Sequence, residues 1–183
     1  MNRSLLFAGL FLPFAASAAP AGPELSETLA IKADVALAKA DYSFTLAVKA
    51  IASEPSLSVI LPAMSDRRAF YNLHDKSAIT PDSREGAAQW KALRSAAEAM
   101  VTLETLASHQ ADVFYTTAKA VSRDAEASED ATMLSEVFAD LADSAADTYD
   151  ALRAGQFRNI ASELRGLVMS LEDIDHEIFQ VEQ

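Results

Sequence analysis

The sequence of 183 residues contains no cysteine. This absence excludes disulfides and a cysteine-linked lipid anchor, so the fold must hold through packing and hydrogen bonds alone. Glycine and proline are also scarce, with 5 and 6 residues, and turn-rich β folds depend on both. The composition therefore favours an all-α protein.

Basic residues are too few to balance the acidic ones. The chain has 15 Lys and Arg against 27 Asp and Glu, which gives a formal net charge of −12. Nucleic acids and anionic membrane surfaces attract basic proteins, so this balance argues against both as partners. A well-solvated surface or a cationic partner fits an acidic chain better.

Long apolar runs are lacking except near the N-terminus, where the first 18 residues have the pattern of a secretory signal. Arg3 is the basic part, residues 5–14 form the apolar core, and small residues at 16–18 form the cleavage site. The apolar core is too short to span a bilayer. We therefore expect cleavage after Ala18, a periplasmic location, and one mature domain of residues 19–183 that does not insert into a membrane.

The clearest periodic pattern covers residues 133–181, where apolar residues recur at steps of three and four in two arms. Gly155 lies in the turn 153–156 between them and can take the left-handed conformation that ends a helix. The pattern predicts two antiparallel helices, each with an apolar face too broad for one neighbour to cover. The repeating positions are Leu134, Phe138, Leu141, Ala145, Thr148 and Leu152, then Phe157, Ile160, Leu164, Leu167, Leu171, Ile174, Ile178 and Val181.

Two further long helices are predicted before this hairpin. The first covers residues 25–53 and ends at Pro55, and a short apolar piece follows at 56–63. The second begins at Pro81 with Thr80 as its N-cap. Its apolar face continues to residue 106, and the sequence leaves open whether the helix breaks near Ser108. Residues 123–130, with Ser128 as the cap, are predicted to connect it to the hairpin.

Residues 65–79 lack a clean period and hold the only cluster of cations and aromatics in the chain. The cluster consists of Arg67, Arg68, Phe70, Tyr71, Leu73 and His74. One interpretation is a crossover loop that covers the end of the helices. The other is a recognition loop, since loops on rigid scaffolds often carry binding residues.

The hairpin, with a small-residue turn and a last helix that ends in an apolar position before a short polar tail, resembles the C-terminal half of cytochrome c-prime-type four-helix bundles. Residues 89–97, with the sequence Gln-Trp-Lys-Ala-Leu-Arg-Ser-Ala-Ala, are similar to a helix of the same family. The resemblance covers roughly two-thirds of the mature chain and implies an antiparallel four-helix bundle, here with a long crossover loop and an extra helical segment.

In that family the last helix carries a Cys-x-x-Cys-His motif that binds haem, with the His about twenty positions beyond the turn glycine. Aligned on Gly155 without gaps, the cysteine positions fall on Leu171 and Ile174 and the histidine position on Asp175. His176 follows, but at roughly 100° per residue it lies about 140° from the apolar stripe, and Asp175 about 40° from it. His176 should therefore point outward, and the resemblance implies a bundle that has lost its haem site.

Asp175 thus falls at the edge of the predicted core. A buried carboxylate must be hydrogen-bonded, paired, hydrated or protonated. One interpretation anchors it to a cation or places it in a small polar pocket that could hold a ligand. In the other, Asp175 leans out to solvent from the rim. The candidate cations are Lys32, Lys39, Lys49 and Arg94.

The sequence therefore predicts a haem-free periplasmic binding or interaction protein without a cofactor, with an unidentified protein or small molecule as its partner. The alternative is a cytochrome that holds haem non-covalently through His176, for electron transfer or gas binding. The resemblance also implies a homodimer. No enzyme is expected, because His74 and His109 are isolated, Asp173 and His176 lack the second pair of a di-iron site, and phosphate-loop and zinc motifs are absent.

Overall fold

The computed structural model describes residues 22–73, 79 and 83–181, and within these ranges the chain forms α-helices and no strand. The all-α prediction is therefore confirmed for this part of the chain. The predicted signal at 1–18, His74, Thr80 and Pro81 lie outside the described residues. None of the helices in these ranges is both long and apolar enough to cross a membrane.

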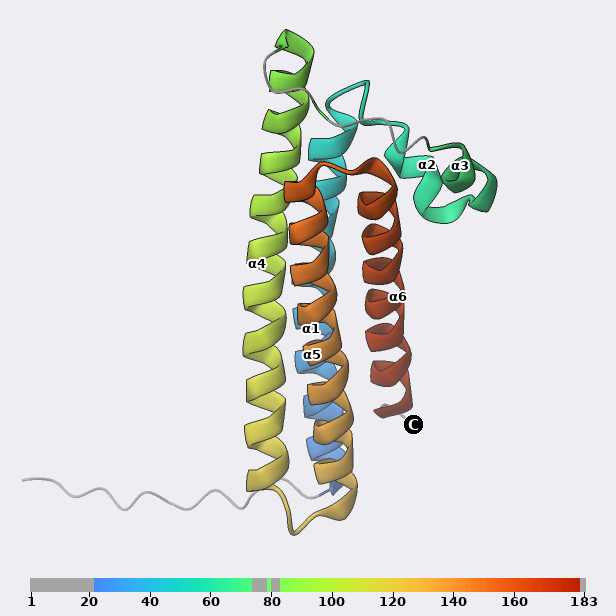
Figure 1. The fold of residues 1–183 in the computed structure, drawn as a ribbon. Coiled ribbons are helices and arrows are strands. Elements are labelled where there is room, and N and C mark those ends of the chain that lie inside the picture. Colours follow the sequence, from blue (N-terminus) through green and yellow to red (C-terminus); the bar gives the residue numbers. More distant parts are fainter. Residues whose placement is uncertain (1–21, 74–78, 80–82, 182–183) are drawn as a thin grey trace, which may run out of the picture.

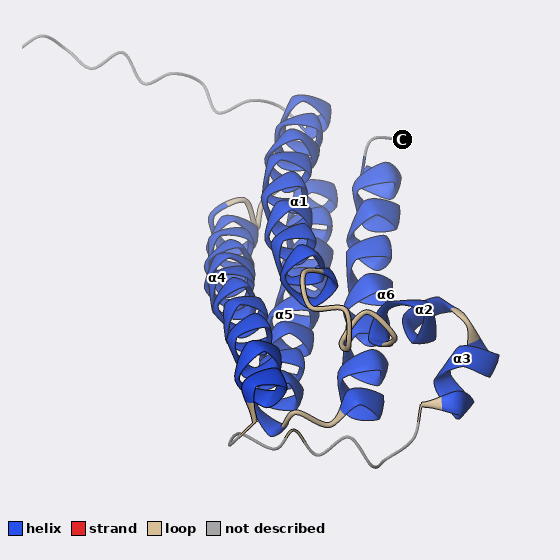
Figure 2. Cartoon of the chain, turned by 90° about the horizontal axis from the view of Figure 1, so that it is seen from above, coloured by secondary structure: helices blue, strands red, loops and turns tan. Residues whose placement is uncertain are grey.

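Four long helices run side by side and alternate in direction along the chain (Figure 1). They are α1 (Gly22–Ala52), α4 (Arg84–Ala120), α5 (Ala125–Ala154) and α6 (Phe157–Val181). Helix α1 packs against α4 and α6, and α5 packs against the same two. In the view from above of Figure 2, α4 and α6 lie on opposite sides of α1 and α5, and buried side chains of all four helices form one core.

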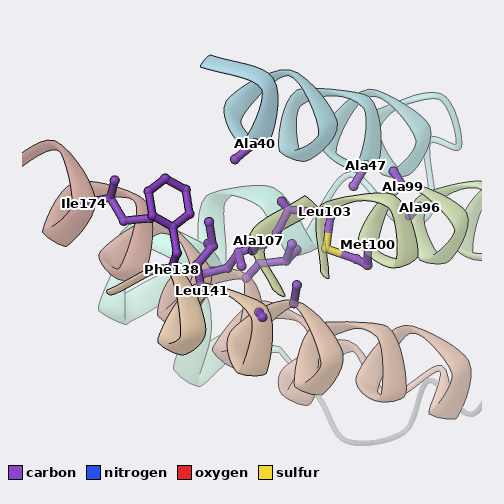
Figure 3. Packing of buried hydrophobic residues seen from close by; sticks show 14 of the residues in the cluster. Ala40, Ala47, Ala96, Ala99, Met100, Leu103, Ala107, Phe138, Leu141 and Ile174 are labelled. Atoms are coloured by element: carbon purple, nitrogen blue, oxygen red, sulfur yellow. The ribbon is translucent and has the colours of Figure 1, made fainter. Parts of the chain in front are cut away.

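The core is built mostly from alanine and leucine. Alanines let α1 and α4 approach closely, and Figure 3 shows Ala47 of α1 beside Ala96 and Ala99 of α4. Larger side chains fill the space between α4 and α5, where the ring centroids of Phe114 and Phe138 are 5.6 Å apart. Each large side chain removed from water in this way stabilises the fold by about 1.5–3 kcal/mol.

The predicted hairpin is confirmed. Gly155 has φ 68° and ψ 22° and caps α5, and its amide donates a hydrogen bond to the carbonyl of Ala151 at 3.1 Å. The repeating apolar positions of both arms are buried, except that Leu171 is only half-buried. A left-handed residue reverses the chain within two residues, so α5 and α6 are antiparallel.

The predicted connection at 123–130 was too long, because the helix already begins at Ala125. Asp124, not Ser128, is the N-cap of α5, and its carboxylate accepts a hydrogen bond from the amide of Ala127 at 3.2 Å. Ser128 lies inside the helix and donates to the carbonyl of Ala118 at 3.1 Å. Acidic residues near a helix N-terminus are favoured by its dipole, so the acidic run extends α5 instead of interrupting it.

Helix α4 is continuous through Ser108, which settles the question that the sequence left open. The helix begins at Arg84, not at Pro81 as predicted. Its N-cap is Ser83, whose hydroxyl accepts a hydrogen bond from the amide of Gly86 at 2.8 Å. Ser108 is exposed on the helix surface, where a serine costs little helix propensity and gives the chain no reason to break.

Residues 60–73 are mainly helical, so the prediction of a loop from 65 onward was wrong for α3 (Arg67–Asn72), which follows α2 (Ile60–Ser65). The two short helices form an arm beside α6 (Figure 2). Arg165 of α6 donates hydrogen bonds to the carbonyls of Met64 and Ala63, the latter at 2.9 Å. Arg158 donates to the carbonyl of Leu73 at 2.8 Å. Two arginines of α6 thus hold the ends of both short helices.

Within this arm the aromatic and cationic residues separate into two groups. Phe70 is half-buried, with the guanidinium carbons of Arg158 and Arg165 at 5.9 and 5.3 Å from its ring centroid. Arg67 and Tyr71 are exposed, with 5.6 Å between the guanidinium carbon and the ring centroid. Phe70 therefore helps to attach the arm to α6, and only exposed side chains such as those of Arg67 and Tyr71 could recognise a partner.

Candidate functional site

The positions that the resemblance assigned to haem do not form one site. Ile174 is fully buried in the core and lies close to Phe138 in Figure 3, whereas Leu171 is half-buried. Asp175 and His176 are both exposed, so the outward orientation predicted for His176 is confirmed.

Asp175 is exposed at the rim and is not anchored to a cation, but it does line a small polar hollow, as one of the two interpretations allowed. The side chain is exposed and lines a shallow hollow between α1 and α6 of about 350 Å³, together with Asp34 and Glu172. The other lining residues are His176, Ile178 and Phe179, and no lysine or arginine lines this hollow. Within the described residues no cluster of His, Asp and Glu has the arrangement of a metal site.

A more promising concavity is a groove between α4 and α5, close to the turn that joins α5 to α6. The groove encloses about 460 Å³, which lies within the range of small-molecule sites. We call it the α4–α5 groove. Its lining residues come from one face of each helix and are Trp90, Leu93, Arg94, Ala97, Glu98, Val101, Tyr149, Leu152 and Arg153.

The floor of the α4–α5 groove is apolar and its walls are partly aromatic. Leu93, Ala97 and Leu152 are buried and form the floor. Trp90 and Tyr149 are half-buried and form walls, so each ring keeps one part accessible from the groove.

Trp90 is held in place by the α5–α6 turn. A β-carbon placed on Gly155 would lie only 3.0 Å from Cη2 of Trp90, and the side chain of Ile79 is also close to this glycine. The indole Nε1 is buried and has no hydrogen-bond partner among the described residues. The position of this wall is therefore fixed by packing, not by a polar contact.

Two arginines supply positive charge at the rim. Arg94 and Arg153 are exposed and line the groove from opposite helices, with Glu98 one turn beyond Arg94. Arg153 donates a hydrogen bond to Tyr149 Oη at 3.2 Å, and its guanidinium carbon lies 5.7 Å from the ring centroid. A second hollow of about 500 Å³ shares Trp90 and Arg94 and adds Lys91.

Two exposed arginines line this groove although the whole chain has a net charge of −12. Guanidinium groups bind carboxylates through parallel hydrogen bonds, and aromatic walls favour a flat or aliphatic body. The groove can therefore hold a small amphipathic anion with its apolar part on Leu93 and Leu152 and its charge at the rim.

The sequence predicts an apolar face for this helix up to residue 106, which includes Trp90, Leu93 and Ala97, but it does not bring these residues together with α5. Arg94 was considered only as a partner for Asp175. The missing step was the pairing of α4 with α5, which places Tyr149 and Arg153 opposite Trp90. Helical periodicity shows which face is apolar, but it does not show which two helices meet.

Comparisons of the chain with protein-family models, with curated protein sequences and with solved structures found no match.

Proposed function

We propose that this chain is a haem-free periplasmic binding protein, a four-helix bundle related to the cytochrome c-prime type, and that the α4–α5 groove holds a small amphipathic anion. The observation that carries the binding part is that Arg94 and Arg153 line, from two helices, an apolar groove with aromatic walls in an acidic protein. The ligand class is a monoanion, such as a carboxylate, with an aromatic or aliphatic body.

Other features support the remaining parts. The haem-free part rests on the lack of cysteine and on the exposed position of His176. The bundle part is supported by four long helices that alternate in direction around one core. The periplasmic part rests on the signal pattern of residues 1–18.

Three ligands that have the same apolar part but a negative, a neutral or a positive head group test the binding part of the proposal. Phenylbutyrate, phenylbutanol and phenylbutylamine share the apolar part and differ in the charge of the head group. Trp90 is the only tryptophan of the chain, so its fluorescence reports occupation of the groove. We expect saturable binding of phenylbutyrate and at least about tenfold weaker binding of the alcohol, which corresponds to a loss of about 1.4 kcal/mol. Equal responses to all three compounds, or none, would overturn the proposal.

Matched variants locate the charge. Arg94→Gln combined with Arg153→Gln should weaken phenylbutyrate binding by about tenfold or more, because a charge-assisted hydrogen bond is stronger than a neutral one. Arg123→Gln is the control, since Arg123 is exposed in the turn at the other end of α4. Binding that the control weakens as much as the double variant would mean that net charge, not the groove, attracts the ligand.

The haem-binding alternative has a separate test. On the haem-free proposal, added hemin gives no saturable Soret band that depends on His176, because this side chain is exposed. One-to-one binding that His176→Ala abolishes would replace the haem-free proposal with the cytochrome alternative. The phenylbutyrate experiment does not depend on this result.

A further inference from the structure

The outer side of the short-helix arm is basic and aromatic. Helix α3 lies farther from α6 than α2 does in both views (Figure 1 and Figure 2). At roughly 100° per residue, Arg67, Tyr71 and Arg68 fall within one arc of about 100°, with Tyr71 between the two arginines. All three side chains are exposed. We call these three residues the α3 face.

The opposite side of α3 fixes the α3 face in place. Leu73 is buried, and Phe70 is half-buried beside the guanidinium groups of Arg158 and Arg165. Arg158 also donates a hydrogen bond to the carbonyl of Leu73 at 2.8 Å. A surface that is held in place before binding loses little conformational entropy when a partner docks on it. The arm therefore presents the α3 face in a form that is ready for binding.

The positive charge of the α3 face is not neutralised within the arm. Asp66 is the only acidic residue among residues 60–73. Its carboxylate accepts a hydrogen bond from the backbone amide of Arg68 at 2.8 Å, as the N-cap of α3. The Arg67 guanidinium contacts the ring of Tyr71, and its Nη2 donates a hydrogen bond to Tyr71 Oη at 3.5 Å. Both guanidinium groups can thus still bind a carboxylate from outside.

The half of the bundle that carries the arm lacks the acidic excess of the rest. This half, upper in Figure 1, consists of residues 40–73, 83–102 and 142–170, with nine Lys and Arg and nine Asp and Glu. The other described residues include four Lys and Arg and fifteen Asp and Glu. Along α6, the middle of the acidic half near residue 176 is roughly 16 Å from residue 165, about twice the Debye length at physiological salt. An acidic partner can therefore approach the arm without strong repulsion.

An acidic protein segment fits the α3 face better than an anionic membrane does. One basic residue near an anionic membrane raises the affinity by only about fivefold, so two arginines raise it by about thirtyfold. Firm membrane binding also needs apolar groups that insert. Arginine and carboxylate instead form directional, paired hydrogen bonds, and tyrosine and arginine are enriched among the residues that dominate protein interfaces.

We propose that the α3 face is a docking surface for an acidic segment of another protein. Carboxylates of the partner bind Arg67 and Arg68, and an apolar side chain of the partner packs on Tyr71. This partner has the opposite charge to the one that the net charge of the chain favours. The α3 face shares no residue with the α4–α5 groove, so either proposal can fail without the other.

Titration with a short acidic peptide tests the proposal. The probe is acetyl-Glu-Asp-Glu-Leu-Asp-Glu-amide, the control peptide is acetyl-Gln-Asn-Gln-Leu-Asn-Gln-amide, and nuclear magnetic resonance of the labelled mature protein follows binding. The acidic peptide should shift the amides of residues 66–73 saturably and bind at least about tenfold more tightly than the control. Binding should weaken with added salt, which screens exposed charges. No saturable shift in these residues at millimolar peptide, or equal binding of both peptides, would overturn the proposal.

Variants show whether the two arginines hold the peptide. Arg67→Gln with Arg68→Gln should weaken binding of the acidic peptide by at least about tenfold. Lys119→Gln is the control, because Lys119 and Tyr115 form a similar exposed pair in the acidic half, with 3.9 Å between Nζ and the ring centroid. Peptide binding that the control weakens as much as the double variant would contradict the proposal.

Tyr71 supplies a second variant that leaves both charges in place. Tyr71→Ala should weaken binding of the acidic peptide by at least about threefold, and Tyr71→Phe should bind like the wild type, because the ring supplies the apolar contact. Hydrogen exchange in residues 60–73 shows whether each variant keeps the arm folded. Wild-type binding by both the alanine variant and the double arginine variant would overturn the proposal.

Two further outcomes would assign the peptide or the arm to another role. Sedimentation with phosphatidylglycerol vesicles that the double arginine variant abolishes, without peptide shifts in residues 66–73, would replace the protein partner with a membrane. Peptide shifts confined to residues 90–101 and 149–153 would place the peptide in the α4–α5 groove and overturn the proposal. Arg94→Gln with Arg153→Gln should therefore bind the acidic peptide like the wild type.

Discussion

The indole ring of Trp90 lies so close to Gly155 that a β-carbon at residue 155 would come within 3.0 Å of Trp90 Cη2. The same glycine has φ 68° and ends α5. One residue without a side chain therefore allows both the turn between α5 and α6 and the position of one wall of the α4–α5 groove.

Gly155→Ala should destabilise the protein by more than about 2 kcal/mol, because a left-handed alanine alone costs about 1–2 kcal/mol and the new β-carbon also collides with the indole. Urea denaturation followed by circular dichroism measures the change. Gly166→Ala is the control: beyond the adjacent residues and backbone of its own helix, no atom lies within 4 Å of the new β-carbon, so it should stabilise α6 by about 0.5–1 kcal/mol. Equal stabilities of the two variants would contradict this account of the turn.

Ile174→Ala should cost about 2–5 kcal/mol, because the side chain is fully buried and its removal leaves a cavity in the core. Leu171→Ala should cost less than Ile174→Ala, since Leu171 is half-buried and water can fill the space. Thermal unfolding of the two variants gives the comparison. A larger loss at Leu171 would show that the last helix is rotated from the orientation described.

Asp175→Asn should change the free energy of unfolding by less than about 0.5 kcal/mol, because the carboxylate is exposed at the rim of an acidic hollow. The measurement is chemical denaturation at neutral pH. A loss above about 1 kcal/mol would mean that the carboxylate has a partner in solution, which would restore the anchored interpretation.

Arg165→Gln should loosen the short-helix arm, because the guanidinium bridges the carbonyls of Ala63 and Met64 at the end of α2. Loss of hydrogen bonds from a charged donor costs about 1.5–3 kcal/mol each. Hydrogen exchange should become faster in residues 60–73 and stay unchanged in α4 and α5. Arg67→Gln is the control, since Arg67 is exposed. Equal exchange in both variants would show that Arg165 does not attach the arm.

The sequence was most informative where one pattern repeats over many turns. The period of α6 and the glycine at residue 155 together predicted the hairpin, and Ile174 occupies the buried position that the period assigned to it. Leu171 belongs to the same period but lies nearer the edge of the stripe. Periodicity identifies a face of the helix, whereas the depth of each residue depends on how far the neighbouring helix reaches.

The ends of helices and the short arm were harder to predict. Asp124 and Ser128 are both good N-cap residues, and local sequence alone did not decide between them. The short helix α3 escaped detection because six residues are too few to show a period. Its attachment depends on Arg158 and Arg165, which lie more than eighty residues away in the chain. The sequence did not predict the groove for a similar reason: its lining residues come from two helices, and local sequence does not show that these two helices pack together.

The most direct test of the account is nuclear magnetic resonance of the labelled mature protein during titration with phenylbutyrate. The single tryptophan gives one indole N–H signal, and its ring forms a wall of the α4–α5 groove. We predict saturable shifts of this signal and of amides in residues 90–101 and 149–153, which Arg94→Gln with Arg153→Gln reduces. An unchanged indole signal, or shifts confined to other helices, would contradict the claim that this groove binds an amphipathic anion.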